Sequence, residues 1–187
     1  MKNEFRMYVG PMFGGKTTRM LSQVERYRYQ DEDVLLIKPT IDSRYENKSV
    51  VTHTGLKADA VLVSDGDGII KTIARRSTQS SKNKCVVAVD EAFMIRDSGD
   101  ALVWLFKRGH TILVSSLQLS SDGSPYEETT KMFPYATHVE VCPAVCPITK
   151  QDAYYTEKIG GRTDHAIEVG GAEMYQPRCW VEFFGRM

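Results

Sequence analysis

Gly10-Pro11-Met12-Phe13-Gly14-Gly15-Lys16-Thr17 is the stretch of this sequence that decides its fold, and it satisfies the pattern G-x-x-x-x-G-K-[S/T]. A short apolar run, Met7 to Val9, precedes it, and Thr18 to Gln30 has the spacing of a helix. Strand, glycine-containing loop and helix in this order predict a phosphate loop. The glycines let backbone N–H groups turn toward phosphate oxygens, and the helix presents its positive end to the same anion. We therefore expect residues 10–18 to bind a nucleoside triphosphate.

Two side chains of this loop have expected roles in phosphoryl transfer. Lys16 is expected to reach the β- and γ-phosphates, and the Thr17 hydroxyl is expected to hold Mg²⁺. The alternative is an accidental match, but a random chain of this length contains the pattern less than about once in a hundred times. The strand before the loop and the helix after it make an accident rarer still.

Further apolar runs at Val34 to Ile37, Cys85 to Val89 and Thr111 to Ser115 predict strands, with a helix at Gly99 to Arg108. The second run is continuous, as in a strand buried on both faces, and Cys85 is expected to pack there as a buried thiol. Alternating strands and helices predict an α/β fold, a P-loop NTPase-like parallel sheet flanked by helices. Ligands bind such sheets at the carboxyl ends of the strands.

Asp90 and Glu91 follow one of these strands directly. Mg²⁺ at a phosphate loop is usually held also by an aspartate that ends a neighbouring buried strand, which predicts this role for Asp90. A carboxylate one residue further on is placed to take a proton from an attacking hydroxyl, so Glu91 is the candidate base. The alternative is that both carboxylates only favour the start of a helix.

Composition restricts the class of protein and of partner. Lys plus Arg and Asp plus Glu both number 24, which gives a formal net charge of zero and argues against a nucleic-acid partner. No apolar run approaches a membrane span, and Met1 to Arg6 lacks the apolar stretch of a secretory signal. We expect a soluble, intracellular, cytoplasmic protein whose cysteines are free thiols or metal ligands.

The character of the sequence changes beyond Pro134, where cysteines, two Gly-Gly pairs and an aromatic tail follow. We predict a small C-terminal β-rich lasso domain with a flexible loop. The expected division is residues 1–140 for the nucleotide-binding kinase domain and 141–187 for a lasso or zinc-ribbon-like domain.

The phosphate loop with its Met12 and Phe13, followed by Asp90-Glu91-Ala92, resembles the type II thymidine kinases, which are the cellular, bacterial and poxviral enzymes. The resemblance extends over most of the chain. Its further segments are Lys38-Pro39-Thr40-Ile41-Asp42-Ser43-Arg44-Tyr45, Thr52-His53-Thr54-Gly55, Pro125-Tyr126, Tyr154-Tyr155-Thr156 and Val169-Gly170-Gly171-Ala172-Glu173-Met174-Tyr175.

This resemblance implies transfer of the γ-phosphoryl group of ATP to the 5′-hydroxyl of thymidine, with Glu91 as the catalytic base. It also implies a homotetramer and a loop, about Ile148 to Tyr175, that closes over the nucleoside. The residues expected to contact substrate are Met12, Asp42, Arg44, Met94, Leu117, Ser121 and Tyr175. For Asp42 and Arg44, a salt bridge within their loop is the alternative.

The chain departs from the family at three places. Phe93 and Met94 stand where the family has Gln and Phe, and Ser121 stands where a phenylalanine packs on the base. These changes leave two alternative functions open. The chain is then either a kinase for another nucleoside, such as a 5-modified deoxyuridine, or a regulatory module that binds nucleotide without turnover. At the family's structural zinc site, Thr149 and Glu182 replace two of the four ligands. A rearranged zinc site of Cys142, Cys146 and Cys179, with Glu182 or a histidine as the fourth ligand, is one hypothesis, and an appendage held by apolar residues without metal is the other.

Overall fold

A six-stranded sheet in the order β5-β2-β6-β7-β1-β8 forms the centre of the structure, and its neighbouring strands are parallel. The computed structural model describes residues 3–42, 49–51, 57–77, 83–159 and 170–185. The six strands are β1 (Phe5–Val9), β2 (Val34–Pro39), β5 (Val61–Val63), β6 (Val86–Val89), β7 (Thr111–Ser116) and β8 (His138–Val141). The predicted α/β class with a parallel sheet is confirmed, and so are the four strands expected from apolar runs.

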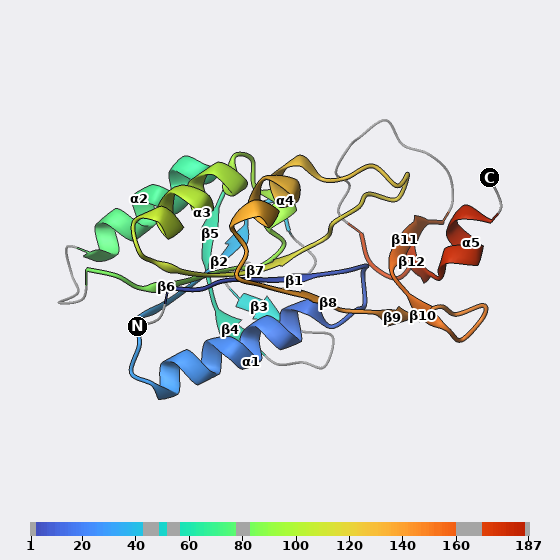
Figure 1. The fold of residues 1–187 in the computed structure, drawn as a ribbon, viewed down its shortest axis with the longest axis horizontal. Helices are drawn as coiled ribbons and strands as arrows, with labels where there is room; N and C mark the ends of the chain where they lie inside the picture. Colours follow the sequence, from blue (N-terminus) through green and yellow to red (C-terminus); the bar gives the residue numbers. More distant parts are fainter. Residues whose placement is uncertain (1–2, 43–48, 52–56, 78–82, 160–169, 186–187) are drawn as a thin grey trace.

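Helices cover both faces of the sheet (Figure 1). One face carries α1 (Lys16–Tyr29) together with an antiparallel hairpin of β3 (Ser49–Val51) and β4 (Lys57–Asp59). The other face carries α2 (Gly66–Ser77), α3 (Ser98–Lys107), α4 (Glu127–Met132) and two short 3₁₀ turns, η1 (Ala92–Met94) and η2 (Phe133–Tyr135). None of the helices in the described ranges is long and apolar enough to cross a membrane.

Strand β6 shows why its sequence is an uninterrupted apolar run. Successive side chains of a strand point to opposite faces, so Val87 and Val89 join the apolar cluster under α2 and α3. Val86 and Ala88 join the cluster under α1. All four side chains are fully buried. Burial on both faces is what the continuous run predicted.

Two elements of the sheet escaped prediction from sequence. Strand β5 has three residues, too few to show a period, and β8 lies at the sheet edge with Val139 and Val141 partly exposed. Strand β8 alternates His138, Val139, Glu140 and Val141, and none of these side chains is buried, so it shows no continuous apolar run. β8 matters for the site, because it pairs with β1 and continues directly to Cys142.

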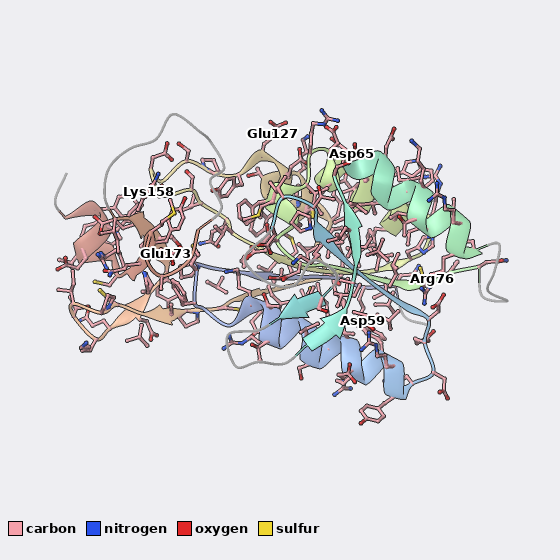
Figure 2. All side chains as sticks on the ribbon, turned by 180° about the vertical axis from the view of Figure 1, so that it is seen from behind. Asp59, Asp65, Arg76, Glu127, Lys158 and Glu173 are labelled. Atoms are coloured by element: carbon pink, nitrogen blue, oxygen red, sulfur yellow. The ribbon has the colours of Figure 1, made fainter. Side chains whose placement is uncertain are left out.

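The C-terminal unit lies at one end of the sheet, beyond the carboxyl end of β1 (Figure 1). It comprises two antiparallel pairs, β9 (Ala144–Val145) with β10 (Asp152–Ala153) and β11 (Tyr155–Lys158) with β12 (Tyr175–Arg178), and then α5 (Trp180–Phe184). Figure 2 shows Lys158 and Glu173 on this unit and Arg76, in the last turn of α2, toward the other end of the molecule. The small β-rich C-terminal part is thus confirmed, while its division from the rest at residue 140 stays a prediction.

Aromatic rings hold the C-terminal unit together. The rings of Tyr155 and Phe183 stack with centroids 5.0 Å apart, and Phe184 meets both edge-on at 4.9 and 4.8 Å. Such ring pairs contribute about 0.5–1.5 kcal/mol each beyond the area they bury. The aromatic tail seen in the sequence is therefore the small core of this unit.

Candidate active site

The candidate site lies where three neighbouring strands end. The phosphate loop follows β1, Leu117 follows β7, and Asp90 and Glu91 follow β6. β7 lies between β6 and β1, so parallel pairing brings all three carboxyl ends to one edge of the sheet. This edge faces the C-terminal unit (Figure 1).

The phosphate loop has the backbone conformation that its glycines permit. Gly10 has φ 142° and Gly15 has φ 76°, values that side chains strongly disfavour, and Phe13 also lies in the left-handed region at φ 67°. Lys16 begins α1, is buried, and donates from Nζ to the Pro11 carbonyl at 2.6 Å. The ammonium is thereby held over the loop. Thr18, expected to contact nucleotide, lies exposed in the first turn of α1.

The backbone carbonyl of Cys142 packs directly against the phosphate loop. A Cβ added at Gly10 would lie 2.4 Å from the Cys142 oxygen, and one at Gly14 would lie 2.3 Å from the same atom. Both separations are shorter than any real Cβ contact, and the opposing atom is main chain, which cannot rotate away. Packing alone therefore requires glycine at both positions.

Arg19 fixes the loop from the side. Its Nη1 donates to the Gly14 carbonyl at 2.9 Å, and its Nε lies 2.6 Å from Glu140 Oε1 on β8. The guanidinium joins the loop to the same strand that delivers Cys142. Sequence inspection missed this residue because an arginine in a first helical turn has no distinctive pattern.

The two predicted magnesium ligands are brought together. Thr17 Oγ1 donates to Asp90 Oδ1 at 2.9 Å, and Asp90 is buried at the end of β6. A hydroxyl and a carboxylate are hard oxygen donors of the kind Mg²⁺ prefers, so the residues fit this ion. Mg²⁺ is usually bound by one or two carboxylates plus substrate phosphates and water, so two protein groups suffice here.

Glu91 occupies an unusual backbone conformation. Its φ is 50° and ψ is 45°, the left-handed region that few residues other than glycine adopt, and its carbonyl accepts from Met94 N–H at 3.0 Å. The carboxylate atom Oε2 is shielded from solvent. Backbone strain of this kind, about 1–3 kcal/mol, persists where the surroundings hold the residue in place, and it is frequent at active sites.

An apolar cluster adjoins Glu91. Its buried members are Met12, Phe93, Met94 and Leu117, with Phe13, Tyr126 and Tyr175 partly buried against them. The structure therefore unites four of the predicted substrate residues: Met12, Met94, Leu117 and Tyr175. The rings of Phe93 and Tyr126 lie with centroids 4.5 Å apart at an interplanar angle of 42°.

Tyr126 was missed as a pocket residue, although it stands in the Pro125-Tyr126 pair that the resemblance singled out. Burial raises the pKa of its hydroxyl well above the usual range, and the nearby Tyr175 and Glu91, when ionised, add to the effect. A tyrosine phenol is neutral at physiological pH even at its ordinary pKa of about 10, and it can donate a hydrogen bond.

Two other predicted substrate residues are described by the structure. Ser121 stands in a turn closed by Ser120 N–H donating to the Ser124 carbonyl at 2.9 Å. Asp42 is buried after β2, with Oδ2 3.8 Å from Lys38 Nζ. Arg44 lies outside the described residues.

The C-terminal unit contacts the phosphate loop directly. Met12 N–H donates to Thr156 Oγ1 at 3.0 Å in a buried position, and Thr156 belongs to β11. Met12 thus takes part in both the phosphate loop and the apolar cluster. The sequence showed Thr156 as part of a family motif, but it did not show this partner.

The cysteines divide into two sets. Cys142 packs in the cluster under α1, whereas Cys146 and Cys179 pack with Ala144 and Ala153 in the C-terminal unit. Thr149 Oγ1 donates to Cys179 Sγ at 3.3 Å. Burial tends to raise the pKa of the Cys146 thiol, but hydrogen bonds from Thr149, Cys179 and Ile148 outweigh it and lower the pKa to about 6.

The hypothesis of a zinc site shared by all three cysteines is not supported. In the described part of the chain, no group of three Cys, His, Asp or Glu side chains is placed to hold a metal ion. Structural zinc needs four protein ligands, and the present pair supplies two thiols.

Comparison with known sequences agrees with this geometry. The sequence profile described as "Thymidine kinase" matches residues 3–183. The chain belongs to the thymidine kinase family. It is 36% identical over 178 residues to a thymidine kinase of Pyrobaculum aerophilum, a match that covers 91% of this chain and 93% of the relative. As a thymidine kinase family member, the chain places its phosphate loop, acidic pair and apolar cluster within one continuous match.

The close packing behind the phosphate loop gives a testable expectation for Gly14→Ala. The added Cβ collides with the Cys142 carbonyl, so the loop must shift. Its backbone N–H groups then no longer point toward the position of the phosphate oxygens. We expect the rise in melting temperature caused by Mg-ATP to fall to near zero, measured by thermal denaturation.

Gly68→Ala is the matched control, because its Cβ would meet neighbours at an ordinary 3.4 Å in the first turn of α2. This variant should keep the full response to Mg-ATP. An unchanged response in Gly14→Ala would mean that the Cys142 contact does not define the loop.

Proposed function

We propose that this chain transfers the γ-phosphoryl group of ATP to the 5′-hydroxyl of thymidine, giving thymidine monophosphate for DNA synthesis. One observation carries the proposal: the Thr17–Asp90 pair, Glu91 and the apolar cluster converge beside the phosphate loop at one edge of the sheet. Membership of the thymidine kinase family and the name of the Pyrobaculum relative support the same reaction.

The triphosphate binds along the loop and the start of α1. Backbone N–H groups of residues 10–17 and the positive end of the helix surround the phosphate oxygens. The Lys16 ammonium exchanges the Pro11 carbonyl for the β- and γ-phosphate oxygens of ATP. These oxygens are stronger hydrogen-bond acceptors than the carbonyl because they carry negative charge. Thr17 and Asp90 would hold Mg²⁺, which would supply positive charge to offset the charge that develops on the transferring group.

The nucleoside binds against the apolar cluster. Met12, Leu117 and Met94 provide a dry wall for the base, and the neutral phenol of Tyr126 offers one hydrogen-bond donor. Glu91 accepts the proton of the 5′-hydroxyl as that oxygen attacks the γ-phosphorus. Phosphoryl transfer requires mainly positioning and charge stabilisation, which such a site supplies.

The direct test is phosphorylation of a nucleoside panel by the purified chain with Mg-ATP: thymidine, deoxyuridine, 5-hydroxymethyldeoxyuridine and deoxycytidine. Thymidine should be turned over with the highest kcat/KM. Preference for another nucleoside would keep the chemistry and change the acceptor. Inactivity on all four, with ATP still raising the melting temperature, would favour a module that binds nucleotide without turnover.

Glu91→Gln tests the general base. The amide keeps the size of the side chain but cannot take the proton, so kcat should fall by roughly 10²–10⁴. Binding of Mg-ATP, followed by thermal denaturation, should be retained because Glu91 is separate from the phosphate loop. Normal turnover in this variant would exclude Glu91 as the base.

Asp90→Asn tests the metal role. The amide oxygen still accepts from Thr17, but the negative charge is lost, so the Mg²⁺ concentration that gives half-maximal rate should rise about tenfold or more. The measurement is a titration of rate against free Mg²⁺ at fixed ATP. Asp59→Asn, an exposed carboxylate on β4, is the control and should leave the titration unchanged.

Two variants test whether Phe93 or residue 121 provides the aromatic contact to the nucleoside base. Phe93→Ala removes a buried ring that contacts Tyr126, so KM for thymidine should rise about tenfold, with bulkier 5-substituted nucleosides affected less. Ser121→Phe should change KM by less than about twofold, because Ser121 is partly exposed in the turn between Ser120 and Ser124. A large gain in thymidine affinity from Ser121→Phe would reverse this assignment and favour a substrate that uses the space at residue 121.

We also propose that the chain acts in the cytoplasm, where its substrates are found, and assembles as a homotetramer without nucleic-acid partners. The family resemblance supports the assembly, and the partly exposed Val139 and Val141 on edge strand β8 offer a surface for it. Light scattering coupled to size exclusion measures the mass directly, and a monomeric mass would contradict the proposal.

A further inference from the structure

Two thiols meet in the C-terminal unit although they come from opposite ends of it. Cys146 follows β9, and Cys179 lies between β12 and α5. The segment between them includes β10, β11 and β12. Any covalent link between the two sulfurs would therefore enclose most of the unit in one loop.

Packing and hydrogen bonds bring the two cysteines together. Both belong to one buried cluster with Ala144 and Ala153. Cys146 forms a turn in which Lys150 N–H donates to the Cys146 carbonyl at 2.9 Å, and Thr149 of this turn donates from its hydroxyl to Cys179 Sγ at 3.3 Å. The turn that carries one cysteine is thus bonded to the sulfur of the other.

The surrounding residues do not suit the structural zinc that the family resemblance implies. The Thr149 hydroxyl donates a hydrogen bond to Cys179 Sγ. A zinc site would need a metal ligand at residue 149, and a hydroxyl that donates to the neighbouring sulfur does not serve as one. Cys142 is unavailable as a third thiol, since it packs under α1 and its Sγ points to the Glu140 carbonyl at 3.7 Å. Within the ranges that the structure describes, the set stops at two thiols.

The covering over this pair is thin. Both thiols are buried, yet the residues beside them are open to solvent: Val145 is 59% exposed, Ile148 50%, Trp180 61% and Val181 57%. Each cysteine is thus next in the chain to exposed residues, and local opening of this small unit would expose the sulfurs to a small oxidant.

We propose that Cys146 and Cys179 form a reversible redox site that closes to a disulfide in place of the family's zinc. With a small disulfide such as oxidised glutathione as the oxidant, the Cys146 thiolate attacks one sulfur of the oxidant and releases one glutathione thiol. The Cys179 thiolate then attacks Cys146 Sγ in the mixed disulfide and releases the second. The chain loses two electrons and two protons, and the oxidant is reduced to two thiols.

Closure acts on the strands that reach the candidate active site. β11 carries Thr156, which accepts from Met12 N–H, and β12 begins at Tyr175, a member of the apolar cluster. A link between the turn after β9 and the start of α5 restrains both strands. The oxidised chain should accordingly hold its C-terminal unit against the phosphate loop at temperatures where the reduced chain has released it.

The test uses the full-length chain, purified under reducing conditions and then incubated with oxidised or reduced glutathione. Intact mass after oxidation should fall by two hydrogens, and peptide mapping should find Cys146 joined to Cys179. The melting temperature should rise by about 5–15 °C, as expected for a disulfide that closes a loop of this length, and dithiothreitol should reverse it. The mass readout does not depend on kinase activity.

Cys146→Ser and Cys179→Ser should each abolish the two-hydrogen loss, whereas Cys85→Ala and Cys142→Ala should keep it. Persistent glutathione adducts without an internal link would overturn the proposal. So would a link to Cys142, or one zinc ion per chain that copurifies and protects Cys146 and Cys179 from alkylation.

Discussion

The contact between the Cys142 carbonyl and the phosphate loop is the constraint on which the rest of the site depends. It leaves no room for a Cβ at Gly10 or Gly14, and it comes from the residue that directly follows β8. The conformation of the loop is thus restricted by the residue that follows the edge strand of its own sheet. Arg19 reinforces the arrangement by joining the Gly14 carbonyl to Glu140 on the same strand.

The order of strands then determines which side chains meet the loop. With β7 between β1 and β6, the ends of these strands supply Leu117 and the Asp90–Glu91 pair at one edge. Asp90 is buried and bonded to Thr17, while Glu91 leaves the strand in a left-handed conformation toward the apolar cluster. Adjacent residues therefore have different neighbours: Asp90 is bonded to the start of α1, and Glu91 lies beside the apolar cluster.

The sequence predicted those parts whose chemistry is local. A phosphate loop is contiguous, and a strand such as Val86–Val89 shows its burial in its own composition. Tyr126, Thr156 and Arg19 were missed because their roles depend on partners far along the chain, which no local pattern records. Ser121 stays a prediction: its position in a motif suggested a pocket contact, and the structure places it in a turn between Ser120 and Ser124. The cysteines likewise looked like one group by spacing, whereas the sheet edge separates Cys142 from the other two.

Met12 belongs to three structures at once: the phosphate loop, the apolar cluster, and the hydrogen bond to Thr156. A displacement of its backbone by one ligand is therefore felt at the place where the other ligand binds. Thermodynamic linkage makes such an effect reciprocal, so whatever factor the nucleotide imposes on nucleoside affinity, the nucleoside imposes on nucleotide affinity. Met12 thus connects the phosphate loop with the apolar cluster, and its hydrogen bond to Thr156 extends this connection to the C-terminal unit.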